Sequence, residues 1–259
     1  MLLRRVITHV RQQEWTAIAI DLLIVVVGVF IGIQVSNWND SRLREETAQD
    51  YIERIRADLQ ANLDDFQQRS TYFSQVRIHA LSALEALDKP EATPGQQFLI
   101  DAYQASQTLP RRLGRDTYDE MLSVGANDAI ADVTIRNRLA NFYRSTEAQV
   151  VLLRPETQYR GLIRGGMPYA AQAAIRAACD DISDTGEAGE PIISLPNSCH
   201  PDLTPEQVAV AVDAVLQLDI RQDLTRRLTD LDQKLNALAR TVDRAKLLDA
   251  YLAHRGVNP

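Results

Sequence analysis

The segment DLLIVVVGVFIGIQVSNWND, residues 21–40, decides where the chain lies and how its fold begins. It belongs to an apolar run that extends from Trp15 to Val35 and carries few polar side chains. About 20 residues of helix span the hydrocarbon core of a bilayer, so the run predicts a transmembrane helix over residues 15–38. Trp15 and Trp38 are the only tryptophans, and their amphipathic rings suit the two headgroup zones as interface anchors. A cleavable signal peptide is the competing interpretation, because a basic stretch before an apolar run is typical of both.

One face of this helix carries an acid and two glycines. Five residues at helical spacing form that helix-packing face: Asp21, Val25, Gly28, Gly32 and Val35. Small residues four apart let a second helix backbone approach closely, whereas an acid near mid-membrane costs about 2.5 to 3.5 kcal/mol. We therefore predict that this face packs on another transmembrane protein or on a second copy of the chain. The alternative is that Asp21 reaches headgroup water on the cytoplasmic side and that the glycines are incidental.

The charge around the helix predicts its orientation. Arg4, Arg5 and Arg11 precede it, and basic residues are retained on the cytoplasmic side. We therefore expect residues 1–14 to form a short cytoplasmic N-terminus and residues 39–259 to form an extracytoplasmic domain. This arrangement is that of a single-pass protein of the bacterial inner membrane with most of its chain in the periplasm.

The two cysteines agree with an oxidising compartment. Cys179 and Cys199 are the only pair in the chain, and such a pair outside the cytoplasm usually forms a disulfide. They enclose most of an irregular loop over residues 180–201, which is rich in turn residues. Its apolar residues between 192 and 195 are expected to pack back on the helices in a short extended piece. Two unpaired buried thiols are the other possibility.

The rest of the chain has the patterns of a helical protein. Apolar residues make up 45% and aromatic residues 6%, which excludes wholesale disorder and argues against a β-sandwich. From Ile52 to Leu87 the apolar residues follow one helix face, which predicts a helix ending near Asp88. From Leu224 to Ala245 they alternate in steps of four and three, the seam of an antiparallel bundle or a coiled coil. We predict an all-α fold in which the membrane helix continues into an elongated extracytoplasmic bundle with a disulfide-tied loop.

Capping signals predict where other helices begin. Residues 93–96 (TPGQ) and 204–207 (TPEQ) each combine a capping threonine with a proline and a glutamine, and the first should start a short helix that ends near Leu109. Asp116 and Asp132 are predicted to cap two further helices.

Gly125 is expected to end the helix that Asp116 begins, in a left-handed conformation. A second break is predicted at Gly165, Gly166 and Pro168, before a helix over residues 169–179.

Residues with reaction chemistry are sparse, and we predict no catalytic residues, no metal ligands and no cofactor. The four histidines do not fall into a metal-binding spacing, and no nucleotide-binding or hydrolase motif occurs. His200 beside Cys199 is the one nucleophilic pair to weigh, but a disulfide-bonded cysteine is no nucleophile. The acidic pairs at residues 64–65 and 180–181 are most simply solvated. The net charge of -7 speaks against a nucleic-acid partner.

The membrane segment resembles a known family. Residues 17–40, AIAIDLLIVVVGVFIGIQVSNWND, are similar to the N-terminal signature of a family of uncharacterised bacterial single-pass membrane proteins, a domain of unknown function. In that family an acid opens an apolar run with a central glycine, and the run ends in Asn-Trp-Asn and an acid. Asp21, Gly28 and residues 37–40 match these features. Residues 117–147 also resemble a later block of the family, with its tyrosine-rich helix and glycine turn.

Two positions depart from the family pattern, Ser36 and Gly32, where Asn and Ala are more usual. Both remain small, so they are compatible with a packing face. The resemblance implies a membrane topology but no mechanism, because the family has no assigned activity.

Three classes of function follow from these patterns. The first is a non-catalytic interaction protein, an accessory or scaffold subunit that docks on a membrane complex. The second is a periplasmic helical bundle that senses a ligand and signals through a transmembrane partner, since the predicted cytoplasmic segment is too short for an output domain. The third is an envelope enzyme, which we do not expect. An apolar pocket with convergent polar groups between helices would favour sensing, and a broad exposed apolar patch would favour docking.

Overall fold

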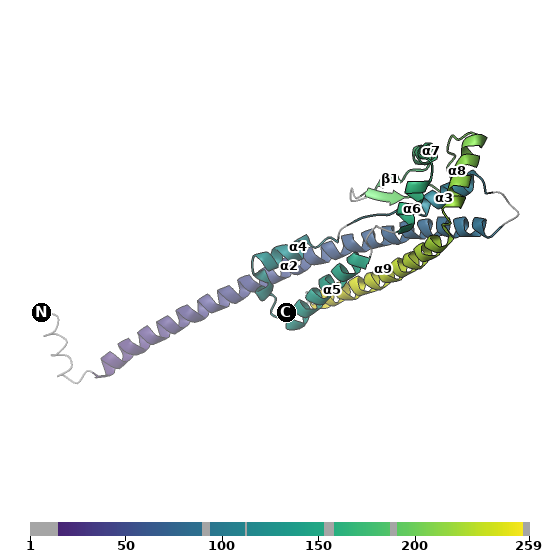
Figure 1. The fold of residues 1–259 in the computed structure, drawn as a ribbon. Coiled ribbons are helices and arrows are strands. Elements are labelled where there is room, and N and C mark those ends of the chain that lie inside the picture. Colours follow the sequence, from purple (N-terminus) through teal and green to yellow (C-terminus); the bar gives the residue numbers. More distant parts are fainter. Residues whose placement is uncertain (1–14, 90–93, 112, 153–157, 187–190, 256–259) are drawn as a thin grey trace.

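The computed structural model describes residues 15–89, 94–111, 113–152, 158–186 and 191–255. The predicted cytoplasmic segment 1–14 lies outside the described residues, as does Thr93 of the first capping signal. The described residues form an elongated, almost entirely helical molecule (Figure 1). In chain order its elements are α2 (Trp15–Leu87), α3 (Gln96–Gln104), α4 (Asp116–Ser123), η1 (Ala126–Ala129), α5 (Val133–Leu152), α6 (Gln158–Gly166), α7 (Tyr169–Cys179), β1 (Ile182–Thr185), β2 (Pro191–Ser194), α8 (Pro205–Gln217) and α9 (Arg221–Arg255). The predicted all-α fold is confirmed, with one small hairpin added.

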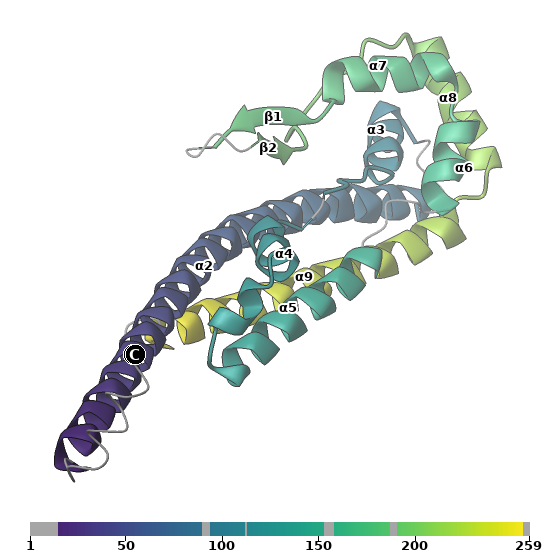
Figure 2. The same cartoon turned by 90° about the vertical axis from the view of Figure 1, so that its left-hand side faces the viewer.

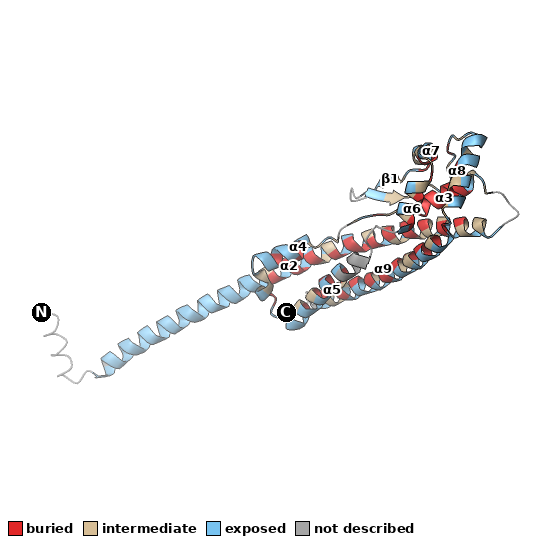
Figure 3. Cartoon of the chain, viewed as in Figure 1, coloured by how far each residue is buried: buried red, intermediate tan, exposed pale blue. Residues whose placement is uncertain are grey.

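Helix α2 runs through the whole length of the molecule. It contains 73 residues, which corresponds to about 110 Å of helix. Beyond Gly32 it contains neither glycine nor proline, and it ends at Leu87, just before Pro90, as predicted. Its first part is exposed all round, and its buried face begins at Ala48 (Figure 3).

Helix α9 packs antiparallel along the distal part of α2, so its heptad seam contacts a helix of the same chain. The leucines of the seam are buried except for Leu235, which is half-buried, and Leu224 and Leu231 are fully buried. Ion pairs set the register, because Arg77 on α2 contacts Asp232 on α9 with 2.6 Å between Nε and Oδ1. The preference for a bundle over an intermolecular coiled coil is therefore confirmed in this chain.

The core consists of two apolar clusters along the rod. The membrane-proximal cluster lies among α2, α4, α5 and α9, with Ile55, Met121 and Leu139 at its centre. The distal cluster lies where α3, α6, α7 and α8 gather around the far ends of α2 and α9 (Figure 2). Gly166 belongs to this crowded end, since a Cβ atom there would lie 2.4 Å from Leu218 Cδ1. The glycine thus allows α6 to approach the end of α8.

The disulfide between Cys179 and Cys199 is present, as predicted, and ties the end of α7 to the segment before α8. The loop between them contains the antiparallel hairpin of β1 and β2, in which Ile182 pairs with Ser194. Leu195 is buried, and its backbone accepts from and donates to the Gln75 amide at 3.1 and 3.0 Å. The expected extended piece therefore packs on α2.

The capping predictions succeeded where the cap is local. Thr204 forms the full capping box with Gln207, and the Asp132 carboxylate accepts from the Thr134 amide at 2.7 Å. Gly125 has a φ of 71°, the predicted left-handed conformation. The break before α7 also lies where it was expected.

Two boundary predictions were wrong. Helix α3 begins at Gln96 with Gly95 as its N-cap and ends at Gln104, so it is shorter than the TPGQ signal indicated. Asp116 is the first residue of α4 and makes no capping bond. Its expected role is taken by Asp58 of α2, whose carboxylate accepts from the Thr117 amide at 3.3 Å. A tertiary contact thus replaced the local cap.

Candidate functional site

The membrane-proximal part of α2 is the most unusual surface of the molecule. Its most apolar 18-residue window has a mean hydropathy of 2.7, and none of that window is buried. The helix is therefore long and apolar enough to cross a membrane. Trp15 and Trp38 are 65% and 68% exposed, and about 35 Å of helix separates them. This distance slightly exceeds the roughly 30 Å of a hydrocarbon core.

The predicted packing face lies open along this part of α2. Its five residues are all exposed: Asp21, Val25, Gly28, Gly32 and Val35. A Cβ atom added at Gly28 or at Gly32 would meet nothing within 4 Å. Among the described residues no side chain or backbone group bonds to the Asp21 carboxylate. The described part of the chain supplies no neighbour for this face.

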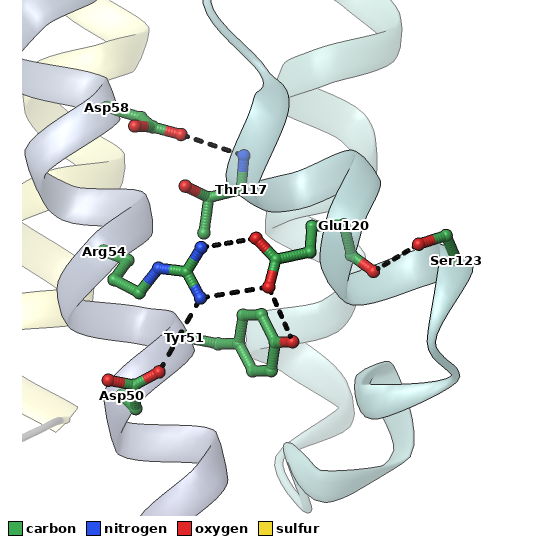
Figure 4. A network of polar contacts seen from close by, with 7 residues as sticks. All are labelled: Asp50, Tyr51, Arg54, Asp58, Thr117, Glu120 and Ser123. Atoms are coloured by element: carbon green, nitrogen blue, oxygen red, sulfur yellow. Dashed lines mark hydrogen bonds and ion pairs between the residues drawn. The ribbon is translucent and has the colours of Figure 1, made fainter.

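The folded domain begins at a polar junction between α2 and α4 (Figure 4). The Arg54 guanidinium forms an ion pair with the Glu120 carboxylate, with 3.2 Å between Nη1 and Oε1. The Tyr51 hydroxyl donates to the same Oε1 at 3.2 Å, and Asp50 Oδ2 lies 3.8 Å from Arg54 Nη1. The hydrogen bond from Arg54 lowers the pKa of Glu120, and the same hydrogen bond raises the pKa of Arg54.

This junction is exposed, so its ion pair adds little to the free energy of unfolding. Its geometric role is larger. It orients α4 against α2 where Tyr51 and Met121 enter the membrane-proximal core. The junction therefore marks the point at which the single helix becomes a packed domain.

A groove of about 370 Å³ lies between α5 and α9. Its residues come from both helices: Arg138, Asn141, Phe142, Ser145, Arg244, Leu247 and Leu248. Leu247 is 69% exposed, and the Arg138 guanidinium lies 4.1 Å from the centre of the Tyr251 ring. The groove combines apolar walls with a few polar groups, as ligand sites often do.

The sequence alone did not reveal this groove or the α2–α4 junction. Both depend on residues that are distant in the sequence, such as Arg54 with Glu120 and Arg138 with Arg244. One signal for the groove is present, since Leu247 is an apolar residue that lies off the heptad seam of α9.

The described residues offer few groups for metal binding or nucleophilic catalysis. Within the described ranges no group of three or more His, Cys, Asp and Glu residues lies close enough together to hold a metal ion. Cys199 is bonded to Cys179 in the disulfide, so it has no free thiol that His200 could deprotonate.

Comparison with known proteins adds no relative. No family model, no curated protein and no solved structure matches this chain.

Proposed function

We propose that the protein is a non-catalytic accessory or scaffold subunit, anchored in a membrane, that docks on a membrane complex through its transmembrane face and its extracytoplasmic helices. The partner is another transmembrane protein or a second copy of this chain. The proposal places the protein in the bacterial inner membrane, with its N-terminus in the cytoplasm and its bundle in the periplasm. The similarity of residues 17–40 to the family of single-pass membrane proteins agrees with this topology and remains a prediction.

The observation that carries the proposal is the open face with Asp21 at one end and Gly28 and Gly32 at its middle. In lipid a carboxylate costs free energy unless it meets water, a proton or a partner. The glycines leave the helix backbone accessible to a second helix, because nothing lies near them. A partner helix with a polar group at the depth of Asp21 would satisfy both features at once.

The extracytoplasmic part supports the same assignment in another way. Its two apolar clusters are filled by residues of the chain itself, so the bundle has its own core. A partner is then not needed for folding and is free to be recognised by the membrane helix. Leucine substitutions in that helix are accordingly expected to separate binding from folding.

The experiment is purification of the tagged full-length protein in mild detergent, with identification of every membrane protein that copurifies. The variants Gly28→Leu and Asp21→Leu change the packing face, and Phe30→Leu places the same residue on the opposite face as a matched control. We expect a stoichiometric partner, or a dimer, that is lost in both face variants and retained in the control. If wild type and all three variants run as the same single species with nothing bound, α2 is only an anchor and the proposal fails.

The orientation has its own test. A C-terminal alkaline phosphatase fusion should be active, and a fusion at the N-terminus should be inactive, because this enzyme needs the oxidising periplasm. The reverse pattern would contradict the proposed topology.

A second function is favoured by the groove between α5 and α9. An apolar groove with arginine side chains at its edge suits a small amphipathic anion, and a sensor would bind such a ligand in its bundle. A sensor would pass the signal to a transmembrane partner through α2. In that case the partner would copurify in a ligand-dependent amount, whereas a scaffold subunit would hold it constantly.

A further inference from the structure

Arginines from α6 converge on the segment that follows α3, residues 105–107. Arg160 Nη1 donates to the Ser106 carbonyl at 2.8 Å. Arg164 Nε donates to the Ser106 hydroxyl at 3.1 Å, and its Nη2 donates to Gln107 Oε1 at 3.0 Å. The acceptors in these bonds are neutral oxygens.

Arg227 of α9 also binds this segment. Its Nε donates to the Ala105 carbonyl at 3.0 Å, and its Nη2 donates to the Gln107 carbonyl at 2.7 Å. The side chain is only 1% exposed, and its buried Nη1 has no hydrogen-bond acceptor. Burial lowers the pKa of Arg227 to about 10, and the nearby Arg160 acts in the same direction. A buried guanidinium normally finds an acceptor for each nitrogen, so an unpartnered nitrogen at this depth is unusual.

The end of α3 explains only part of this arrangement. The carbonyl groups at a helix C-terminus attract cations with an effective charge of about half an electron. Arg164 and Arg227 alone bring two full positive charges to that point. The acids that act on them are Asp181, which accepts from the Tyr72 hydroxyl, and Asp230 on α9. Among the described residues neither acid forms an ion pair with Arg164 or Arg227.

Solvent reaches the outer side of this cluster. Arg160 and Arg164 are half-buried, and Arg176 of α7 lies beside them with similar exposure. The Tyr103 hydroxyl accepts from Arg164 Nη1 at 2.8 Å, and the Arg164 guanidinium lies 4.3 Å from the centre of that ring. The nearby Tyr103 raises the pKa of Arg176, so Tyr103 lies close to two of the guanidinium groups.

We propose that this arginine cluster, Arg160, Arg164, Arg176 and Arg227, binds the phosphate group of a small water-soluble molecule. Guanidinium groups arranged around one point match the several oxygens of a phosphate dianion better than they match a single carboxylate. The phosphate would offer an acceptor near the orphaned Nη1 of Arg227 and would balance the positive charges of Arg164 and Arg227. This inference does not rest on the proposed docking function.

The position of the cluster excludes the headgroups of the anchoring membrane as its ligand. Arg77 pairs with Asp232 on α9, about one and a half helical turns from Arg227. Roughly 60 Å of continuous helix separates Trp38 from Arg77. A lipid headgroup extends only a few ångströms beyond the hydrocarbon core, so the phosphate must belong to a molecule in solution.

The test is calorimetric titration of the full chain, in a neutral detergent at constant ionic strength, with inorganic phosphate and separately with acetate. We expect saturable binding of one phosphate per chain and no saturable binding of acetate. Arg164→Gln should weaken phosphate binding at least tenfold, whereas Arg240→Gln, an exposed arginine elsewhere on α9, should leave it unchanged.

Arg227→Met tests the buried nitrogen but can also disturb folding, so Arg176→Gln at the accessible edge is measured beside it. Circular dichroism and the thermal midpoint of each variant report whether it is folded. A wild-type protein without saturable phosphate binding would overturn the proposal. Equal binding of acetate, or folded Arg164→Gln and Arg176→Gln variants that bind as wild type does, would also overturn it.

Discussion

Arg56 on α2 and Asp249 on α9 form an ion pair across 193 positions of sequence, with 2.8 Å between Nε and Oδ1. The Gln60 amide donates to the other oxygen of the same carboxylate at 3.0 Å. These contacts fix the antiparallel register of the two longest helices near the membrane-proximal core. Because Arg56 is partly exposed, the pair itself contributes at most about 1 kcal/mol to the free energy of unfolding.

The apolar seam behind that pair should therefore supply most of the stability. Leu231→Ala is expected to lower the free energy of unfolding by about 2 to 5 kcal/mol, because Leu231 is fully buried between α9 and α2. Leu247→Ala is the matched control on the same helix, where the side chain is 69% exposed and the change should stay within about 0.5 kcal/mol. Urea unfolding in detergent, followed by circular dichroism, gives both values. Similar losses for the two variants would contradict the assigned seam.

The disulfide should stabilise the distal end of the rod. It joins cysteines 20 positions apart. Closing a loop of this length restricts the conformations of the unfolded chain and thereby stabilises the fold by about 3 kcal/mol. We expect the double variant Cys179→Ser, Cys199→Ser to melt several degrees below wild type. A reductant should lower the wild-type midpoint to that of the variant and leave the variant unaffected. A wild-type thermal midpoint that the reductant does not change would show that the disulfide does not stabilise the fold.

Lys234 should make stability depend on pH. Burial and, to a smaller extent, the nearby Arg227 lower its pKa from 10.5 to about 8, while Asp230 opposes the shift. Between about pH 8 and pH 10.5 the unfolded chain binds the proton that the folded chain has released, so this residue makes stability rise with pH in that window. Below pH 8 the folded state carries the cost of a buried charge.

The variant Lys234→Met removes this cost, and we expect it to be more stable than wild type at pH 7 by on the order of 2 kcal/mol. The difference should shrink as the pH approaches 9. Taking the difference between the two proteins cancels the titration of the buried tyrosines, and Lys246→Met supplies an exposed control. A constant difference across this pH range would refute the assignment.

The capping box of α8 gives a local prediction. Thr204 Oγ1 accepts from the Gln207 amide at 3.3 Å, while the Gln207 side chain accepts from the Thr204 amide at 2.9 Å. Thr204→Ala should cost about 1 kcal/mol, and Thr204→Ser should restore most of it. Thr225→Ala in the exposed second turn of α9 should be nearly neutral, because that hydroxyl only bonds back to the Arg221 carbonyl. Equal losses at the two threonines would argue against a cap.

The sequence predicted features whose causes lie close together along the chain. Thr204 and Gln207 are three residues apart and build their cap from each other, and the heptad leucines of α9 share one face by helical geometry alone. The choice of partner for that face was also predictable, because the buried face of α2 has matching length. The cysteine pairing followed from the count of two.

Features that depend on distant residues were not predictable in this way. Asp116 looked like a cap, but the folded chain brings Asp58 to the Thr117 amide instead. Helix α3 ends early because Arg160 and Arg227 bind the carbonyl groups that follow it. These arginines lie 54 and 122 positions from their acceptors, and no local sequence pattern predicts such contacts.

The continuity of α2 makes the molecule a lever. About 75 Å of one helix joins Trp38, at the end of the apolar segment, to Leu87 at the far tip, without a glycine or proline at which it would hinge. A tilt of about 5° at the membrane surface would then swing the tip through about 6 Å. Small changes in how the membrane helix is seated are thereby converted into displacements larger than a water molecule at the opposite end of the protein.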